Sequence, residues 1–444
     1  MAEKLLSVGL DVGTTSTQMI LSELLIENRA SAFSVPDMEI AQRRILYQSP
    51  IHFTPLLQGE LVDGERIRRI VEAEYAAAGI RREDVDTGAI IITGETSRKE
   101  NAAAVLENIS DLAGDFVVAT AGPDLESILA AKGAGATEYS SRTGKTLLHM
   151  DIGGGTSNLA LIEDGQITAT GCLNVGGRLV KLDEQGALEY ISPVLSGLFP
   201  GQIGQIPANA QLQELADTLV SALEMAAGLR KQTDLLEVLW TREAGVPWQI
   251  PSGKPIMLSF SGGVADCIET EYPDLAFGDI GPILGRTIRR SRLCRGEYRL
   301  GSETIRATVI GAGCHAAQLS GSTVFHQNIV FPLKNLPVVT DMAALSRLDT
   351  AGIWHISEQM PLSYSGITQL AQRIVRDWPC QPVLIAMEAD MAKALGHALA
   401  LRLPPDRPIL CIDRVKLTDS SYLDVGFPIA AALPVVIKTL ILNR

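Results

Sequence analysis

The chain has 444 residues, of which 46% are hydrophobic and 20% charged, as is typical of a globular protein with several folding units. Its formal net charge is −13, and aromatic residues make up only 5%. Nucleic-acid binding needs a basic surface or stacking rings, so this composition disfavours a nucleic-acid partner.

Membrane insertion and secretion are also disfavoured. The most apolar stretch, 429–442, is interrupted by Pro434 and Lys438, and the first residues form no signal-peptide core. The six cysteines contain no Cys-x-x-Cys pair, which indicates neither a disulfide framework nor a zinc site. We expect a cytoplasmic protein without a membrane partner, whose cysteines are buried as small apolar side chains.

A short segment near the start of the chain is repeated. Leu5–Glu23 (LLSVGLDVGTTSTQMILSE) matches Leu147–Glu163 (LLHMDIGGGTSNLALIE) in outline, so that Asp11 corresponds to Asp151. Each copy predicts an apolar strand, an acidic residue, a turn rich in Gly, Ser and Thr, and a second strand. After the second copy, Glu163-Asp164-Gly165 predicts a hairpin turn into a third strand. Two such units predict two similar lobes.

The remaining segments predict alternating helices and strands. Before residue 140 we expect helices at 64–79, 97–113 and 123–132 and strands at 88–93 and 116–119, and in the second lobe a long helical region at 211–242. In the last 119 residues we expect strands at 382–387 and 408–412, a helix at 390–401, and an apolar strand at 435–444.

The two repeated turns carry the candidate chemistry. A strand that ends in aspartate and continues into glycines and threonines offers backbone N–H groups and hydroxyls that can cradle a phosphate. A carboxylate at the strand end suits hydrated Mg²⁺, which prefers few carboxylates together with water and phosphate oxygens. The predicted residues are Asp11, Gly13, Thr14 and Thr15 in one loop, and Asp151, Gly153, Gly154, Gly155 and Thr156 in the other.

A third turn, Gly262-Gly263, follows the apolar strand at 258–261. Taken together, the three turns in this order resemble the actin-like ATPase superfamily. The resemblance implies an α/β fold of two ribonuclease-H-like lobes around a cleft for ATP or ADP and Mg²⁺, with water-mediated metal contacts from Asp11 and Asp151. It also implies that Gly262 and Gly263 lie against the adenosine, that Gly176 and Gly177 lie beside the phosphates, and that 122–135 and 311–321 are connecting helices.

A closer resemblance covers nearly the whole chain. The segments 90–104, 116–136, 306–323 and 333–338 resemble the bacterial ethanolamine ammonia-lyase reactivating factors. That family implies a chaperone-like ATPase that releases damaged cobalamin from ethanolamine ammonia-lyase, in the cytoplasm and in association with the ethanolamine microcompartment. We leave open whether the protein is a monomer or a homodimer. We expect lobes at 1–145 and 146–325 and a C-terminal α/β segment at 326–444 that docks the partner, although 340–363 is shorter than the family suggests.

The catalytic group that activates water is less clear from the sequence. Glu95 and Glu126 are candidates, and each has an alternative interpretation as a structural or surface residue. No motif supplies the acidic base of a sugar kinase. A reactivating factor for another cobalamin enzyme such as diol dehydratase, and an actin-like filament or scaffold, remain alternative functions.

One group of arginines stands out in this acidic chain. A solvated helix face is the simpler interpretation, and a docking patch for an acidic partner is the alternative. The group comprises Arg286, Arg289, Arg290, Arg292, Arg295 and Arg299.

Overall fold

The computed structural model describes most of the chain, and the account below concerns only these residues. They are 3–13, 16–28, 38–57, 61–93, 105, 118–120, 123–241, 256–315, 317–319, 323–348, 350–357, 363–379, 381–415, 417, 421–428 and 433–439. No helix in these ranges is long and apolar enough to cross a membrane.

The first sheet is a mixed sheet in the order β3-β2-β1-β7-β8. β1 and β2 are antiparallel, as are β2 and β3, whereas β1, β7 and β8 are parallel. Its strands are β1 (Glu3–Val12), β2 (Ser16–Asn28), β3 (Met38–Gln48), β7 (Thr87–Ile92) and β8 (Val118–Thr120), with β4 (His52–Phe53) paired to β2. α1 (Gly64–Ala78) packs on one face, and β5 (Leu56–Leu57) and β6 (Leu61–Val62) form a small ribbon.

The second sheet repeats this topology in the order β11-β10-β9-β14-β15. Its first three strands are antiparallel neighbours, and β9, β14 and β15 are parallel. They are β9 (Thr146–Ile152), β10 (Ser157–Glu163), β11 (Gln166–Leu173), β14 (Ile256–Ser261) and β15 (Tyr298–Leu300). Two sheets of identical strand order confirm the predicted α/β fold class with two ribonuclease-H-like lobes.

Apolar helical faces cover the second sheet. The helices of this lobe are α4 (Ala136–Thr143), α5 (Asn209–Ala226), α6 (Asp234–Leu239), α7 (Gly263–Glu269) and α8 (Gly281–Arg290). Leu212, Leu215, Leu219 and Leu223 recur at helical spacing along α5 and are buried in the main core with residues of α8. A small ribbon of β12 (Val180–Leu182) and β13 (Leu188–Ile191) completes the lobe.

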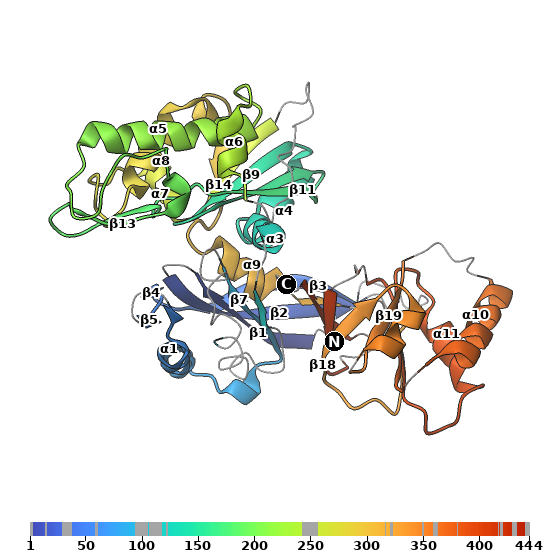
Figure 1. Cartoon of the computed structure of the whole chain (residues 1–444). Coiled ribbons are helices and arrows are strands. Elements are labelled where there is room, and N and C mark those ends of the chain that lie inside the picture. Colours follow the sequence, from blue (N-terminus) through green and yellow to red (C-terminus); the bar gives the residue numbers. More distant parts are fainter. Residues whose placement is uncertain are drawn as a thin grey trace.

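The two lobes are joined where α3 (Pro123–Gly133) crosses α9 (Ala307–His315). α3 packs on β9, β10 and β11, whereas α9 packs on β1, β2 and β7. The junction therefore consists of one helix from the face of each sheet. Figure 1 shows both helices between the blue first lobe and the green second lobe. A Cβ atom added at Gly133 would lie 1.9 Å from the Ala307 carbonyl oxygen, and one at Gly311 would lie 2.1 Å from that of Leu129. The helices therefore touch backbone to backbone.

The third sheet, drawn mainly in orange at the right of Figure 1, has the order β16-β23-β22-β18-β19-β20-β21-β17. β18 to β21 are parallel, and α10 (Tyr364–Asp377) and α11 (Ala392–Ala400) pack in the core on one face. The strands are β16 (Ala317–Leu319), β17 (Phe325–Gln327), β18 (Leu333–Val339), β19 (Ile353–Ile356), β20 (Val383–Met387), β21 (Ile409–Ile412), β22 (Ser421–Val425) and β23 (Pro434–Thr439).

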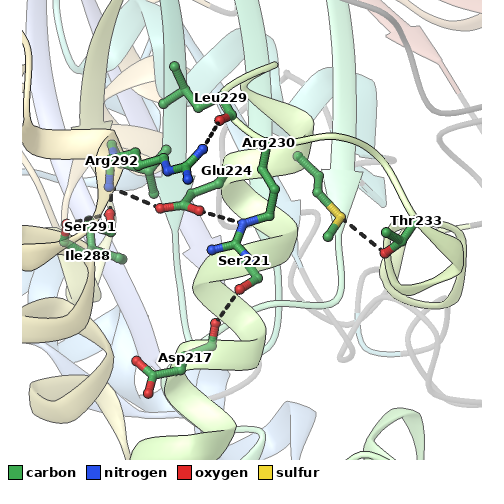
Figure 2. A network of polar contacts seen from close by, with 11 residues as sticks. Asp217, Ser221, Glu224, Leu229, Arg230, Thr233, Ile288, Ser291 and Arg292 are labelled. Carbon is green, nitrogen blue, oxygen red and sulfur yellow. Dashed lines mark hydrogen bonds and ion pairs between the residues drawn. The ribbon is translucent and has the colours of Figure 1, made fainter.

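A buried carboxylate fastens the end of α5 to the turn after α8. Glu224 accepts a hydrogen bond from Arg230 Nε at 2.8 Å and one from the Arg292 backbone N–H at 3.0 Å, as Figure 2 shows. The Arg292 guanidinium donates to the Leu229 carbonyl oxygen at 2.9 Å. Since an unpaired buried carboxylate is strongly unfavourable, these bonds fix the chain path there.

The same contacts bear on the arginine group. Arg286 pairs with Asp274, Arg289 lies 3.5 Å from Glu269, and Arg299 lies over the ring of Tyr139. With Arg292, four of the six arginines thus contact the protein's own surface. These contacts disfavour the docking patch, but the group is not one helix face either, because α8 holds only Arg286, Arg289 and Arg290 and Arg299 lies in β15.

Most predicted elements in the described ranges agree with the structure, including the hairpin turn, where Asp164 and Gly165 both have positive φ. Two predictions are wrong. The helical region at 211–242 is broken because Gly228 (φ 70°) ends α5, while the Leu229 N–H bonds to the Glu224 carbonyl oxygen. The second connecting helix ends at His315 rather than 321, because 317–319 pairs with β23.

Some predictions are not covered by the described residues. The helix at 97–113, apart from Val105, lies outside them, as do 440–444 of the last strand. The boundaries at 145 and 325 stay predictions. Cys172, Cys267, Cys294 and Cys411 are buried free thiols, as expected.

The helix crossing predicts a stability effect for Gly133→Ala. The added methyl group meets backbone rather than a movable side chain, so we expect a loss of about 1–3 kcal/mol, as for other overpacked sites. Gly296→Ala is the matched control, since nothing lies within 4 Å of its added Cβ. Urea unfolding followed by circular dichroism measures both. Equal midpoints for the two variants would show that the helices are not in backbone contact.

Candidate nucleotide and metal site

The described residues of the repeated turns make the same backbone hydrogen bond in both lobes. In the first, the Gly13 N–H donates to the Ser16 carbonyl oxygen at 2.9 Å, and in the second, the Gly153 N–H donates to that of Thr156 at 2.9 Å. Each aspartate is the penultimate residue of its strand. Asp11 lies opposite Gln18, and Asp151 lies opposite Asn158 in the matching register. The sequence repeat is therefore also a structural repeat.

Both turns line one polar cavity of about 140 Å³ at the junction of the lobes. Asp11 and Asp151 both line it, and Glu126 joins them from the first turn of α3. Glu126 is 6% exposed and accepts a hydrogen bond from Asn158 Nδ2 at 2.8 Å. The other lining residues are Gly13, Ser16, Gln18, Thr93, Gly153, Gly154, Gly155, Thr156, Asn158, Gly262, Gly263, Ile305 and Thr308.

The two aspartates are held in an environment that disfavours their charges. Burial raises the pKa of Asp11 to about 7, against a hydrogen bond from Thr93 that lowers it, and the nearby Asp151 raises it further. Burial likewise raises the pKa of Asp151 to about 6, although Ser261 and Thr308 donate to its carboxylate. No Lys or Arg is among the described residues that line this cavity.

Two amide oxygens in the cavity wall also need a partner. Gln18 Oε1 and Asn158 Oδ1, at matching positions of the two lobes, are buried without a hydrogen-bond partner among the described residues. Like-charged carboxylates and unsatisfied oxygens are chemically suited to a hydrated divalent cation. The described residues contain no group of three or more His, Cys, Asp or Glu that could enclose a metal ion. The two carboxylates and two amide oxygens fit a Mg²⁺ ion that keeps its bound waters.

A second, more apolar cavity of about 210 Å³ adjoins the first and shares Gly153, Gly154 and Gly263 with it. Its apolar lining includes Tyr272 and Phe277, whose rings pack edge to face with centroids 5.0 Å apart. Ile51, Phe53 and Ile305 also line it. A polar cavity suited to a cation, beside an apolar one with aromatic walls, has the chemistry to take the metal-bound phosphates and the base of a nucleotide.

The glycines of the third turn divide into two kinds. Gly262 has φ 87°, and an added Cβ would lie 2.3 Å from the Ile152 carbonyl oxygen, so it is required for the turn itself. An added Cβ at Gly263 would contact only the Ile305 side chain, at 3.7 Å. Gly263 lines both cavities, so its missing side chain leaves room for a ligand.

The segment containing Gly176 and Gly177 supports the second loop from behind. The Gly177 N–H donates to the Gly153 carbonyl oxygen at 3.0 Å, and the Arg178 N–H donates to that of Gly154 at 2.6 Å. Gly177 lines the apolar cavity, whereas Gly176 lines neither cavity. Thr14, Thr15 and Glu95 lie outside the described residues.

Sequence reasoning missed several residues of the site. Arg178 lines the apolar cavity and its Nε donates to Asp279 at 3.0 Å. Thr93 donates to Asp11 at 2.8 Å, and Thr308 donates to Asp151 at 3.4 Å. Gln18 and Asn158 could have been predicted from the sequence, because each follows its aspartate by the same number of residues in the repeat. Arg178, Thr93 and Thr308 come from distant segments, and no sequence pattern pointed to them.

The fold and site together define a two-lobed protein of actin-like architecture with two adjoining cavities at the junction of the lobes. The model of the family described as ethanolamine utilisation protein EutA matches residues 3–354 and 346–443. The chain belongs to this family. The two matched segments meet within 340–363, the stretch expected to differ from the family.

Two curated proteins share 38% identity with the chain over an alignment of 475 positions, which covers 98% of this chain and 98% of each relative. Both are called ethanolamine ammonia-lyase reactivase EutA, one from Salmonella typhimurium and one from Escherichia coli. Among solved structures, an exopolyphosphatase from Cytophaga hutchinsonii is similar with a TM-score of 0.39 and 11% identity, covering 69% of this chain and 96% of that one.

The shape of the third turn predicts that Gly263→Val blocks ligand binding without disturbing the fold. Its side chain would project into the shared part of both cavities, where it meets little protein. We expect at least a tenfold loss of ATP affinity in calorimetry and an unchanged melting temperature. Gly262→Val, the matched control, should unfold at lower temperature because it strains the turn. Unaltered ATP affinity in Gly263→Val would remove this loop from the site.

The raised carboxyl pKa values predict a pH effect on stability. The ordinary aspartate pKa is 3.8, so between about pH 4 and 7 Asp11 and Asp151 bind more protons in the folded metal-free protein than in the unfolded chain. The contribution of these two groups to stability should therefore fall as the pH rises through this window. Asp11→Asn removes one of these groups, and its melting temperature in EDTA should fall less between pH 5 and 8 than that of the parent. Parallel pH profiles would contradict the prediction.

Proposed function

We propose that this protein is an ATP-dependent reactivating factor for adenosylcobalamin-dependent ethanolamine ammonia-lyase. It would release cobalamin that has lost its adenosyl group, so that intact coenzyme can bind again. Membership of the family and 38% identity to two relatives called ethanolamine ammonia-lyase reactivase support the partner. The paired aspartate loops around one cavity are the observation that supports a nucleotide-driven mechanism.

The proposed ligands are ATP or ADP with Mg²⁺, and the lining of the two cavities supports this choice. Asp11 and Asp151 would hold Mg²⁺ through water, where the ion would offset the charge of the polyphosphate. The backbone N–H groups of 154–156 would contact the phosphates, as oriented N–H groups do in other anion sites. The N–H groups of Gly13 and Gly153 bond within their own turns, so these two glycines would instead let the phosphates approach closely. The base would lie in the apolar cavity between Tyr272 and Ile305.

Glu126 is the proposed group that orients the attacking water. It lines the polar cavity, and Asn158 fixes one of its carboxylate oxygens by a 2.8 Å bond. A carboxylate held in place by a neighbouring amide can accept a hydrogen bond from water without moving. Glu95 remains a candidate from the sequence alone. Hydrolysis would be slow if water is only oriented and not deprotonated.

The site is connected to the junction between the lobes. Glu126 lies in the first turn of α3, and Thr308, which donates to Asp151, lies in the first turn of α9. These helices are the pair that cross through Gly133 and Gly311. Exchange of ADP for ATP would therefore act on the two helices that set the angle between the lobes.

The energy needed for cofactor release is within reach of a protein interface. Shifting a conformational equilibrium of the lyase from 1:99 to 99:1 needs about 5.5 kcal/mol of differential binding. A nucleotide-dependent change of lobe angle would weaken that interface and allow the factor to dissociate. The C-terminal segment built on the third sheet is the proposed docking unit. Its loops and helix ends expose apolar side chains at Val330, Tyr364 and Leu401.

Recovery of a blocked lyase tests the proposal. Ethanolamine ammonia-lyase is loaded with cyanocobalamin, and ammonia formation is followed after addition of this protein, ATP, Mg²⁺ and adenosylcobalamin. We expect recovery only in the complete mixture. Asp151→Asn should lose two to three orders of magnitude in rate, equivalent to about 3–4 kcal/mol in the transition state.

Two controls make the result specific. Gly296→Ala changes an open surface glycine and should restore activity as well as the parent does. Diol dehydratase blocked in the same way tests the choice of partner. Equal recovery without nucleotide, or recovery of diol dehydratase alone, would contradict the proposed function.

A further inference from the structure

A buried polar ladder lies behind the second aspartate. β9 and β14 are parallel, with His149 beside Ser259 and Asp151 beside Ser261 in register. Because side chains alternate along a strand, these four side chains share one face of the sheet. His149 and both serines are 0% exposed, and Asp151 is 8% exposed. Such a ladder is unusual in a strand pair whose other residues are mostly apolar.

Hydrogen-bond counting fixes the direction of this ladder. The Ser261 hydroxyl has one hydrogen, which it donates to Asp151 Oδ1. It must therefore accept at its other contact, 2.9 Å from His149 Nε2, so Nε2 carries the proton. Nδ1 of the neutral ring is then an acceptor for Ser259 Oγ at 3.1 Å. The chain of donation runs from Ser259 to His149, then to Ser261, and ends on Asp151.

The first lobe shows that the fold does not require this ladder. In the matching positions beside Asp11, β1 and β7 place Gly9 opposite Ala89 and Asp11 opposite Ile91. Asp11 is instead bonded by Thr93, which follows β7. The same topology thus forms with small and apolar residues at these positions. Burying three polar side chains is less favourable than burying apolar ones, so the fold alone does not account for the ladder. The ladder is specific to the lobe that holds Asp151.

We propose that His149 is a positioning residue for the cation site: by orienting the Ser261 hydroxyl, it holds the Asp151 carboxylate in the rotamer that faces the cleft. The inference rests on the proposed function, since it concerns the Mg²⁺ that accompanies the nucleotide. Outer partners of metal-binding groups commonly change metal affinity by 10–100-fold. His149 acts only through Ser261 and touches neither cavity.

The test uses two substitutions whose side chains reach different nitrogen positions of the imidazole ring. In His149→Gln the amide nitrogen can reach the position of Nε2 and still donate to Ser261. In His149→Asn the shorter side chain reaches only as far as Nδ1, so Ser261 loses its donor. ADP affinity of the full-length variants is measured by calorimetry with Mg²⁺ and with EDTA, and folding is checked by melting temperature.

We expect His149→Asn to weaken ADP binding about tenfold with Mg²⁺ and to leave binding in EDTA unchanged, whereas His149→Gln keeps the Mg²⁺ dependence of the parent. Ser261→Ala should reproduce the effect of His149→Asn. Because His149 acts through Ser261, the double variant should be no worse than Ser261→Ala alone. The Ser261 variant also serves if the His149 variants fold poorly.

Ring ¹⁵N shifts of selectively labelled histidine provide a readout that needs no ligand. The His149 resonance, identified by its loss in His149→Gln, should show a protonated Nε2 and a bare Nδ1. A protonated Nδ1, additive effects in the double variant, or equal losses with and without Mg²⁺ would overturn the positioning role. Failure of the parent to bind ADP at all would overturn the proposed function instead, and the cation-site role with it.

Discussion

Two carboxylates of like charge, Asp11 and Asp151, face one cavity in which the described lining residues contain no Lys or Arg. This arrangement is unfavourable without a cation, and burial raises the pKa of both groups. Several surrounding features lessen that cost. Hydroxyls of Thr93, Ser261 and Thr308 donate to the carboxylates. Groups with strongly shifted pKa values are common at functional sites. The proposed Mg²⁺ would remove the repulsion between the two carboxylates.

The same cavity explains why the lobes are joined as they are. α3 and α9 each begin at the cavity wall, with Glu126 and Thr308, and then cross in backbone contact at Gly133 and Gly311. A tight crossing without long side chains transmits small changes in helix position, because there is little soft material to absorb them. The proposed ligand at the helix starts would therefore act on the relative position of the two sheets.

Much of this could be predicted from the sequence, and the limits have a physical cause. The paired loops could be predicted because a strand, an aspartate and a glycine turn are local features of the sequence. The hairpin at Asp164-Gly165 could be predicted from those two residues alone. The partners of the aspartates were not readable, because Ser261 meets Asp151 through the register of strands 110 positions apart in the chain. β16 was mistaken for helix because its pairing with β23 is also distant. Gly228, which ends α5, was a local signal that sequence reasoning overlooked.

Hydrogen exchange of the parent protein with and without ADP and Mg²⁺ most directly tests the proposed site formed by the loops that follow Asp11 and Asp151. The account predicts that amides of 11–20, 151–158 and 262–266 gain protection together, since one ligand contacts loops from both lobes. EDTA should reduce the protection of all three segments. Protection confined to one lobe, or protection that is independent of Mg²⁺, would contradict a shared site built around Asp11 and Asp151.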